Sequence, residues 1–174
     1  ENSPLAASPW LRKEIGRLYE ERYQATGDIE LLDEAIREYS NANVITRNTD
    51  PEGLYLLAQA RFEKLRATNA TNMQEVLAVL EQVDQVDPSY VPAQVLKGRI
   101  AMLQNRPEDA QRIFRRVVED NPRDAQAHLA LAKVYEQNGE LDRAVESYLT
   151  AASLQPGLTQ AWLKAAQLAE QQGN

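Results

Sequence analysis

Small, aromatic and proline positions recur along the chain at a spacing of 34 residues. Shifting the sequence by this distance places Ala110 on Ala144 and Phe114 on Tyr148. No run of alternating polar and apolar residues is long enough to indicate a sheet. A 34-residue period with these residue types at fixed offsets predicts an all-α solenoid of antiparallel helix pairs. Three prolines and three small residues keep the same spacing, namely Pro88, Pro122 and Pro156, and Gly98, Ala132 and Ala166.

Each recurring position has a physical role in such a helix pair. The small residue lies where the two helices approach most closely, because a larger side chain would overpack the contact. Asn105 and Gly139 follow the ends of first helices, where the backbone becomes left-handed. Pro107 suits the first turn of the next helix, since the N–H that it lacks would have no partner there. The three spaced prolines each end a second helix.

Residues 125–158 resemble the tetratricopeptide repeat. With Ala125 counted as position 1, His128 is the single departure, because the family usually has tryptophan there. The matching residues are Leu131, Ala132, Tyr135, Gly139, Ala144, Tyr148, Ala151 and Pro156. In residues 91–124 the match rests on Gly98, Ala110, Phe114 and Pro122. The resemblance implies a right-handed α-solenoid of about four hairpins and a final single helix, with a concave side that binds another protein.

The front half of the chain departs from the 34-residue spacing. The residues expected at the small position are Gly16, Ala60, Gly98, Ala132 and Ala166. The steps between them are 44, 38, 34 and 34. We expect the extra residues in turns and links, around residues 24–32 and 66–73. Asp28 is expected to cap the second helix of the first pair, and Asp50-Pro51 to end it.

These signals predict one superhelical domain over residues 9–174, preceded by a short linker over residues 1–8. The repeats are expected at about 10–51, 52–90, 91–124 and 125–158, with a terminal helix over 159–174. The chain starts without methionine and stops where the family would turn into another second helix. We therefore expect a fragment or a processed domain of a longer protein.

Composition narrows the chemistry that the chain could perform. Cysteine is absent and His128 is the one histidine, so no metal site and no cofactor are expected. No Gly-rich phosphate loop or Ser/His/Asp arrangement occurs, and we expect no catalytic residue and no enzyme. No apolar stretch approaches about 18 residues, which argues against direct membrane insertion. A net charge of −7 argues against nucleic acid as a partner. We expect a cytoplasmic protein, with a periplasmic or other soluble domain of a membrane-anchored protein as the alternative.

Basic residues recur at one position of the expected first helices. In the tetratricopeptide family, positions 2, 5, 6, 9, 12 and 13 of the first helices line the concave wall. In this chain, position 9 as counted from the expected small residues is basic in four successive repeats. With Lys13 at position 5 of the first repeat, the candidate partner-binding residues are Lys13, Arg17, Arg61, Arg99 and Lys133. Arg61 and Arg99 have no acidic residue three or four positions away on their own helices. Guanidinium groups in an aliphatic wall suit a ligand with carboxylates and apolar side chains.

The alternative interpretation of these cations is a solvated face with local ion pairs, such as Lys133 with Glu136. Three functions remain open at this point. The first is a non-catalytic interaction module that binds a peptide or helix of a partner protein in its concave groove. The second is an assembly element that self-associates through its ends, where the terminal helix would expose Trp162, Leu163 and Leu168. The third is a regulatory segment of a larger enzyme or membrane-anchored protein.

Overall fold

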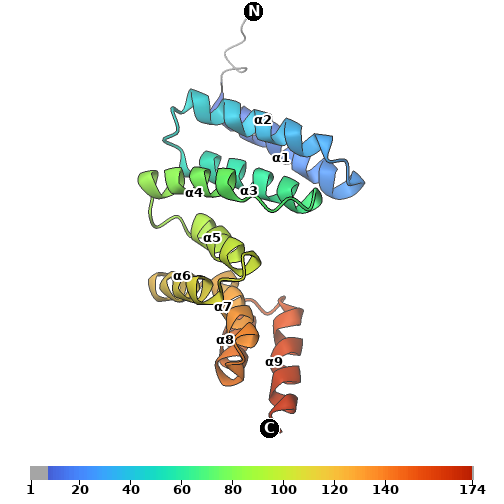
Figure 1. Ribbon diagram of the computed structural model, residues 1–174, viewed down its shortest axis with the longest axis vertical. Helices are drawn as coiled ribbons and strands as arrows, with labels where there is room; N and C mark the ends of the chain where they lie inside the picture. Colours follow the sequence, from blue (N-terminus) through green and yellow to red (C-terminus); the bar gives the residue numbers. More distant parts are fainter. Residues whose placement is uncertain (1–7, 174) are drawn as a thin grey trace, which may run out of the picture. The chain divides into compact units, whose positions relative to one another are not determined.

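The computed structural model describes residues 8–173 and places most of them in helices. Over this range there are nine α-helices and no strand, which confirms the predicted all-α class. Of the predicted linker, residues 1–7 lie outside the described range, and Ser8 is the N-cap of the first helix. The helices of Figure 1 are α1 (Pro9–Thr26), α2 (Glu30–Ile45), α3 (Pro51–Ala67), α4 (Gln74–Val86), α5 (Val91–Leu103), α6 (Pro107–Asp120), α7 (Ala125–Gln137), α8 (Leu141–Leu154) and α9 (Thr159–Gln171).

The chain divides into two compact units, one ending at Ala93 and the other beginning at Gln94. Unit 1 contains α1 to α4 and the first three residues of α5. Unit 2 contains the rest of α5 and the helices α6 to α9. The single domain expected over residues 9–174 stays a prediction, and each unit has its own core.

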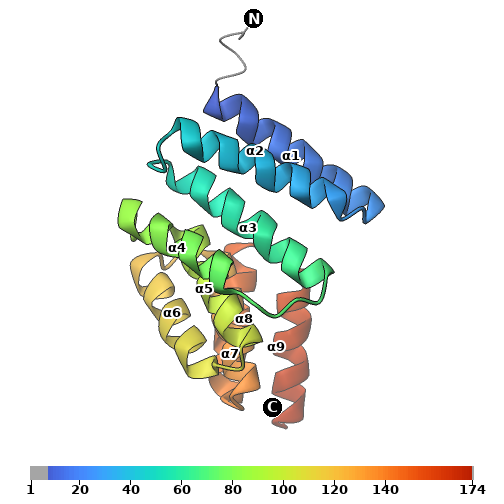
Figure 2. The same ribbon diagram turned by 45° about the horizontal axis from the view of Figure 1, so that its top comes forward.

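Unit 1 consists of two antiparallel helix pairs, α1 with α2 and α3 with α4 (Figure 2). Helix α3 also packs against α2 and touches α1, so the two pairs share an interface. Burying one apolar side chain of this kind stabilises the fold by about 1.5–3 kcal/mol. The largest fully buried side chains of the unit are Leu32, Tyr39, Leu54, Phe62, Val76, Leu80 and Val83.

Unit 2 pairs α5 with α6 and α7 with α8, and α9 packs against α8 (Figure 1). Helix α6 also contacts α7, which joins the two pairs. One apolar cluster extends from α5 to α9, and its members include Ala101, Phe114, Leu131, Val134, Tyr148 and Leu168.

In three of the four pairs, α1–α2, α5–α6 and α7–α8, an aromatic ring of the second helix packs in the core with a glycine or alanine of the first helix. A methyl group placed on Gly16 would come 2.4 Å from Cε1 of Tyr39, and one on Gly98 would come 2.3 Å from Cζ of Phe114. Tyr39 and Phe114 are fully buried, as predicted for these core positions. The small residue is therefore a steric requirement, since any larger side chain would displace the ring.

Two of these rings are tyrosines, and each hydroxyl is bonded to a glutamate on the facing helix. The Tyr39 hydroxyl donates to Oε2 of Glu20 at 2.6 Å, and the Tyr148 hydroxyl donates to Oε2 of Glu136 at 2.6 Å. Both glutamates are the twelfth residue of their helices, α1 and α7. A buried hydroxyl needs such a partner, because leaving it unpaired costs about 1–3 kcal/mol.

The two glutamates have pKa values shifted in opposite directions. Burial raises the pKa of Glu20 despite the hydrogen bond from Tyr39, and the nearby Glu63 carboxylate adds to the rise. Partial burial also works to raise the pKa of Glu136, but hydrogen bonds from Lys164 and Tyr148 outweigh it and lower the pKa. The difference arises because α9 supplies a cation, Lys164 Nζ at 2.7 Å from Glu136 Oε1.

The predicted turn residues have the conformations expected of them. Asn105 and Gly139 have φ angles of 56° and 75°, which lie in the left-handed region. Pro107 is the first residue of α6, as predicted. The helices α4, α6 and α8 each end two residues before one of the spaced prolines.

Two predictions at the boundaries of unit 1 are corrected. Asp50 does not end α2, which stops at Ile45; it caps α3, and its Oδ1 accepts from the backbone N–H of Glu52 at 3.1 Å. Asp28 is not the N-cap of α2, which is Ile29, although Oδ1 of Asp28 accepts from the backbone N–H of Glu30 at 3.1 Å. An Asp-Pro pair can either follow one helix or begin the next. At Asp50-Pro51 it begins α3, and the prediction had assigned it to the end of α2.

The extra residues of the first repeat lie in the helices and not in the predicted turn. Helix α1 continues ten residues beyond Gly16, whereas α7 continues five beyond Ala132. Helix α2 begins five residues before Ala35, whereas α8 begins three before Ala144. The helices α1 and α2 are thus longer than α7 and α8, since no proline or glycine ends them earlier.

Replacing Gly98 by alanine should lower the free energy of unfolding by about 1 kcal/mol. Overpacking against Phe114 costs about 1–3 kcal/mol, and the higher helix propensity of alanine offsets about 1 kcal/mol of this. Urea unfolding measures the change, with Gly157→Ala as the control because no atom lies within 4 Å of its added methyl group. In a Phe114→Leu background the Gly98→Ala change should no longer destabilise, and an undiminished loss would disprove the steric explanation.

Candidate functional site

The start of each first helix fixes the numbering of the residues along it. Ser8 Oγ accepts from the N–H of Leu11 at 3.4 Å, and Asp124 Oδ1 accepts from the N–H of Gln126 at 2.9 Å. With the Asp50 cap of α3, these contacts define residue 1 of α1, α3 and α7. Residue 8 of the five first helices is then Gly16, Ala58, Gly98, Ala132 and Ala166.

This numbering corrects the position expected for Arg61. Residue 8 of α3 is Ala58 and not Ala60, so residue 9 is Gln59 and Arg61 is residue 11. Arg61 lines a hollow of about 390 Å³ between α2, α3 and α4, where its Nη1 lies 3.9 Å from Oε2 of Glu75. Arg61 therefore does not share a helix position with Arg17.

Residues 2, 5 and 9 of a first helix share one stripe, which we call the inner face. At 3.6 residues per turn this stripe is rotated by about 60–120° from residue 8, which packs on the second helix. Of the predicted binding residues, Lys13, Arg17, Arg99 and Lys133 lie on inner faces. The first two belong to unit 1, and the last two belong to unit 2.

In unit 1, the inner-face cations are held by carboxylates of the next first helix. Lys13 Nζ donates to Oδ2 of Asp50 at 3.0 Å and also to Glu52. Arg17 donates to Oε1 of Glu52 at 2.6 Å and also to Glu14. Glu52 thus bridges Lys13 and Arg17, and the structure brings these two predicted site residues together on it.

Protonation of this cluster follows from its contacts. The hydrogen bond from Lys13 lowers the pKa of Glu52, although partial burial opposes the shift. Partial burial also opposes the charge of Lys13, but its bonds to Glu52 and Asp50 raise the pKa of Lys13. The cluster is charged on both sides at neutral pH, so its cations are already neutralised by the protein.

Two tyrosines that the sequence did not single out lie close to the same cluster. The rings of Tyr55 and Tyr90 are 5.7 Å apart between centroids and inclined at 58°. Burial and the nearby carboxylate of Glu52 raise the pKa of Tyr90. Tyr55 is residue 5 of α3, so the corrected numbering would have placed it on the inner face. Unit 1 therefore presents aromatic rings beside an ion-pair cluster.

The inner face of unit 2 combines apolar and basic rows. Residue 5 is Val95 in α5, Leu129 in α7 and Leu163 in α9, and residue 9 is Arg99, Lys133 and Gln167. Val95 and Leu129 are partly buried against the core of the unit, while Leu163 is 57% exposed. The Arg99 and Lys133 side chains are both exposed. Residue 2 of α7 and α9 is Gln126 and Gln160, so the position that binds cations in unit 1 carries no charge here.

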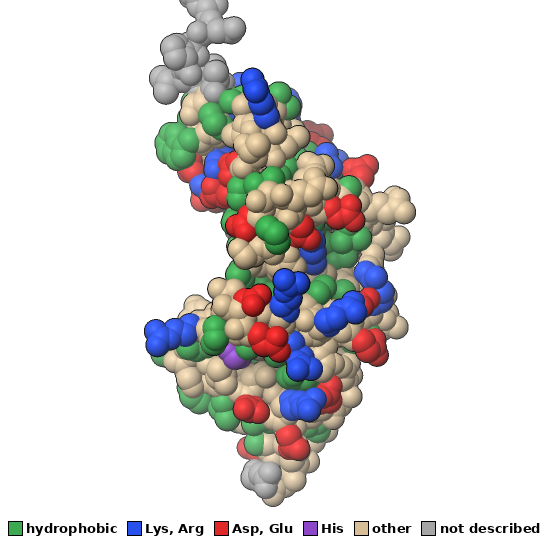
Figure 3. Space-filling view, turned by 90° about the vertical axis from the view of Figure 1, so that its left-hand side faces the viewer, with side chains coloured by type: hydrophobic (Ala, Val, Ile, Leu, Met, Phe, Trp, Pro, Cys, Tyr) green, Lys and Arg blue, Asp and Glu red, His purple; other side chains and the backbone are tan. Residues whose placement is uncertain are grey.

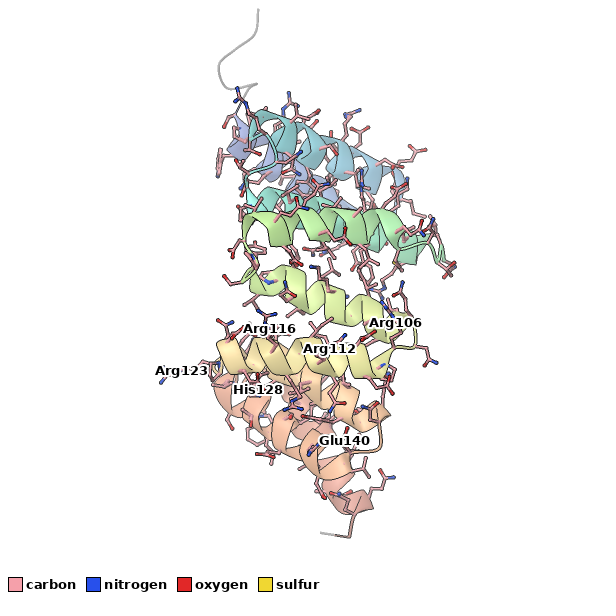
Figure 4. The ribbon with its side chains drawn as sticks, turned by 60° about the vertical axis from the view of Figure 1, so that its left-hand side comes forward. Arg106, Arg112, Arg116, Arg123, His128 and Glu140 are labelled. Atoms are coloured by element: carbon pink, nitrogen blue, oxygen red, sulfur yellow. The ribbon has the colours of Figure 1, made fainter. Side chains whose placement is uncertain are left out.

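The outer face of α6 carries another group of arginines. Arg112 and Arg116 project from this helix (Figure 4), and each side chain is 79% exposed. Arg112 Nη2 lies 2.6 Å from Asp109, and Arg116 Nε lies 3.7 Å from Asp120. Acidic and basic side chains are likewise interspersed on the face that Figure 3 presents. The α6 face is therefore mixed in charge, unlike the basic faces that bind phosphate backbones.

The terminal helix α9 leaves part of its apolar surface uncovered. Trp162 is 45% exposed and Leu163 is 57% exposed. Leu168, which was expected to be exposed with them, is only 6% exposed, because it belongs to the core cluster of unit 2. His128 is partly buried with its Nε2 atom 3.0 Å from the carbonyl oxygen of Pro122.

No group of three or more histidine, aspartate or glutamate side chains among residues 8–173 is placed to hold a metal ion. No helix in the same range has the length and apolar character required to cross a membrane.

Comparison with known proteins gives a family for the second unit. Residues 95–159 match the family model described as the tetratricopeptide repeat. This segment is a tetratricopeptide repeat region. It takes in nearly all of α5 and the whole of α6 to α8, so the resemblance predicted from residues 125–158 is confirmed there. No curated protein matches the chain.

Solved tetratricopeptide-like structures match the whole chain in fold. A crystal structure of MamA protein superposes with a TM-score of 0.65 at 22% identity, covering 95% of this chain and 82% of that chain. MamA from Desulfovibrio magneticus RS-1 gives 0.58 at 21% identity, covering 91% and 97%. YrrB, titled a TPR protein with an unusual peptide-binding site, gives 0.62 at 15% identity, covering 97% and 80%. These similarities confirm an all-α helical repeat fold.

Replacing Glu52 by glutamine should lower the free energy of unfolding at pH 7 by about 0.2–1 kcal/mol, as for other partly exposed ion pairs. Because the folded-state pKa of Glu52 is depressed, its contribution is present above the ordinary value of 4.5 and is lost as pH falls through the folded pKa. Urea unfolding at pH 7 and at steps down to pH 3 should show the parent and variant converging. Glu75→Gln is the matched control, since that side chain is 80% exposed and should show no such convergence.

Proposed function

We propose that this chain is a non-catalytic protein–protein interaction module that binds a peptide or helix on the inner face of unit 2. One observation carries the proposal: an apolar row and a basic row run in parallel along the same first helices. The apolar row is Val95, Leu129 and Leu163, and the basic residues are Arg99 and Lys133. Proteins with the same fold include YrrB, which is described as a TPR protein with an unusual peptide-binding site.

The chemistry of the two rows favours a partner with both acidic and apolar side chains. A partner that covers the partly exposed side chains at residue 5 removes apolar surface from water. This burial stabilises the complex by about 25 cal/mol per Å² of apolar surface. The Arg99 guanidinium can donate two hydrogen bonds to one carboxylate, while Lys133 offers a point charge. An acidic and apolar segment satisfies both rows at once, whereas a purely acidic one leaves the apolar row uncovered.

Unit 1 is less suited to an acidic ligand at the equivalent positions. Its cations, Lys13 and Arg17, are matched by three carboxylates, Glu14, Asp50 and Glu52. A ligand carboxylate would have to displace Glu52 before it could bind either cation. The partly buried Tyr55 on this face suits a neutral or aromatic part of a ligand better than an acidic one.

Replacing Arg99 and Lys133 together by alanine should weaken partner binding at least tenfold and leave helicity and melting unchanged. The expected loss follows from removing two charge-assisted contacts, each worth about 1–3 kcal/mol when shielded by the bound partner. Partners captured by the parent chain are identified by mass spectrometry, and their affinities for both proteins are then measured by calorimetry.

The matched control is Arg112→Ala with Arg116→Ala, which removes the same charge from the outer face of α6. This control should bind as the parent does. Affinity of the parent should also fall as salt rises, because exposed charges are screened within about 10 Å at 0.1 M ionic strength. Equal affinities of the parent and the Arg99/Lys133 variant would refute the proposed site.

A further inference from the structure

Arg61 is the predicted site residue that lies outside the inner face, in the hollow of about 390 Å³ between α2, α3 and α4. Its Nη1 atom is 3.9 Å from Oε2 of Glu75, which is too far for a hydrogen bond, and the Glu75 side chain is 80% exposed. No hydrogen bond to the Arg61 side chain occurs within residues 8–173. Yet that side chain is only 31% exposed. A largely covered guanidinium that the protein itself does not hydrogen-bond is suited to bind an anion.

The link between α3 and α4 forms one side of this hollow (Figure 2). It consists of residues 68–73, and Thr68 and Asn72 from it line the hollow. Asn72 Oδ1 accepts from the N–H of Gln74 at 3.1 Å, so its amide nitrogen is the atom that can donate to a ligand. The links within the other pairs are half as long and comprise residues 27–29, 104–106 and 138–140. The extra residues of the second repeat therefore build part of the hollow.

The rest of the lining offers apolar surface and one neutralised ion pair. Ile36 of α2 and Leu65 of α3 are both partly exposed in the hollow. Lys64 Nζ is bound by Oδ1 of Asp33 on α2, so these two charges cancel. The guanidinium on α3 is thus the cation that remains to attract a ligand, and it lies beside aliphatic side chains.

We propose that this hollow binds a small organic acid, whose carboxylate contacts Arg61 and whose apolar body packs on Ile36 and Leu65. A guanidinium can donate two parallel hydrogen bonds to one carboxylate. The volume lies in the range of about 300–1,000 Å³ that is usual for small-molecule sites. An inorganic anion would leave the aliphatic lining uncovered, and a neutral apolar molecule would leave the guanidinium unbound. The site belongs to unit 1 and does not involve the inner face of unit 2.

The probe is hexanoate, titrated into the uniformly ¹⁵N-labelled 174-residue chain and followed by two-dimensional amide NMR spectra. We expect a dissociation constant of about 1 mM, which a ligand of this size can reach. The amides that shift should be those around Arg61, Thr68 and Asn72. Hexanamide has the same chain without the charge, and acetate has the charge without the chain. Each should bind at least tenfold more weakly than hexanoate.

Two variants of the chain change the affinity in opposite directions. Arg61→Gln should weaken hexanoate binding at least tenfold, because the two charge-assisted hydrogen bonds are lost. Arg22→Gln is the matched control, since it removes the same charge from an exposed position of α1 and should bind as the parent does. Glu75→Gln removes the carboxylate that competes for the guanidinium and should tighten binding by about two- to fivefold.

Several results would overturn the proposal. These are unchanged spectra at about 20 mM hexanoate, equal binding of hexanoate and hexanamide, undiminished binding to Arg61→Gln, or weaker binding to Glu75→Gln. Shifts confined to the amides around Arg99 and Lys133 would overturn it as well, because the acid would then occupy the inner face of unit 2. Weaker binding to Arg61→Gln together with tighter binding to Glu75→Gln would establish the site.

Discussion

The contact between an aromatic ring and a glycine on the facing helix determines how the pairs α1–α2 and α5–α6 are built. At Gly16 and Gly98 the ring comes so close that even a methyl group would collide with it. Such a contact fixes the separation of the helices and the register along them, because the ring fits at one position alone. The same register sets the direction of the residues on the inner face, which lie three or four positions apart along each first helix.

That register also determines which polar groups become buried. A tyrosine at the ring position carries its hydroxyl to residue 12 of the facing helix, where Glu20 and Glu136 accept it. Glu20 lies near another carboxylate, Glu63, and its pKa rises on burial, so its charge weakens the fold at neutral pH. Glu136 is bound by Lys164 of α9, and its pKa is lowered. Docking of α9 therefore stabilises the hydroxyl contact of the preceding pair, and this couples neighbouring repeats.

The sequence predicted the features that depend on local chemistry. Left-handed Asn105 and Gly139, Pro107 at a helix start and the spacing of the prolines each reflect one residue's backbone preference. Register within α3 was missed, because Ala58 and Ala60 are both small and both become buried. The N-cap at Asp50 carried the signal that decides between them, but it was interpreted as the end of the preceding helix.

Ion pairs between different helices could not be predicted from the residues of a single helix. Partners sought three or four positions away on the same helix could not include Glu52, which reaches Lys13 and Arg17 from the next first helix. Glutamate and tyrosine occur together in the first and fourth pairs, yet the hydroxyl contacts between them were not predicted either. Neither kind of contact could be found without first fixing the register of each helix.

Residue 2 of the following first helix contributes to the electrostatics of the inner face. Where it is glutamate, as at Glu52, a cation at residue 9 of the preceding helix is bound by the protein itself. Where it is glutamine, as at Gln126 and Gln160, the same contact would lack the charge that makes it strong. The basic residues of a helical repeat therefore have to be considered together with residue 2 of the next first helix, because that residue can supply a competing carboxylate.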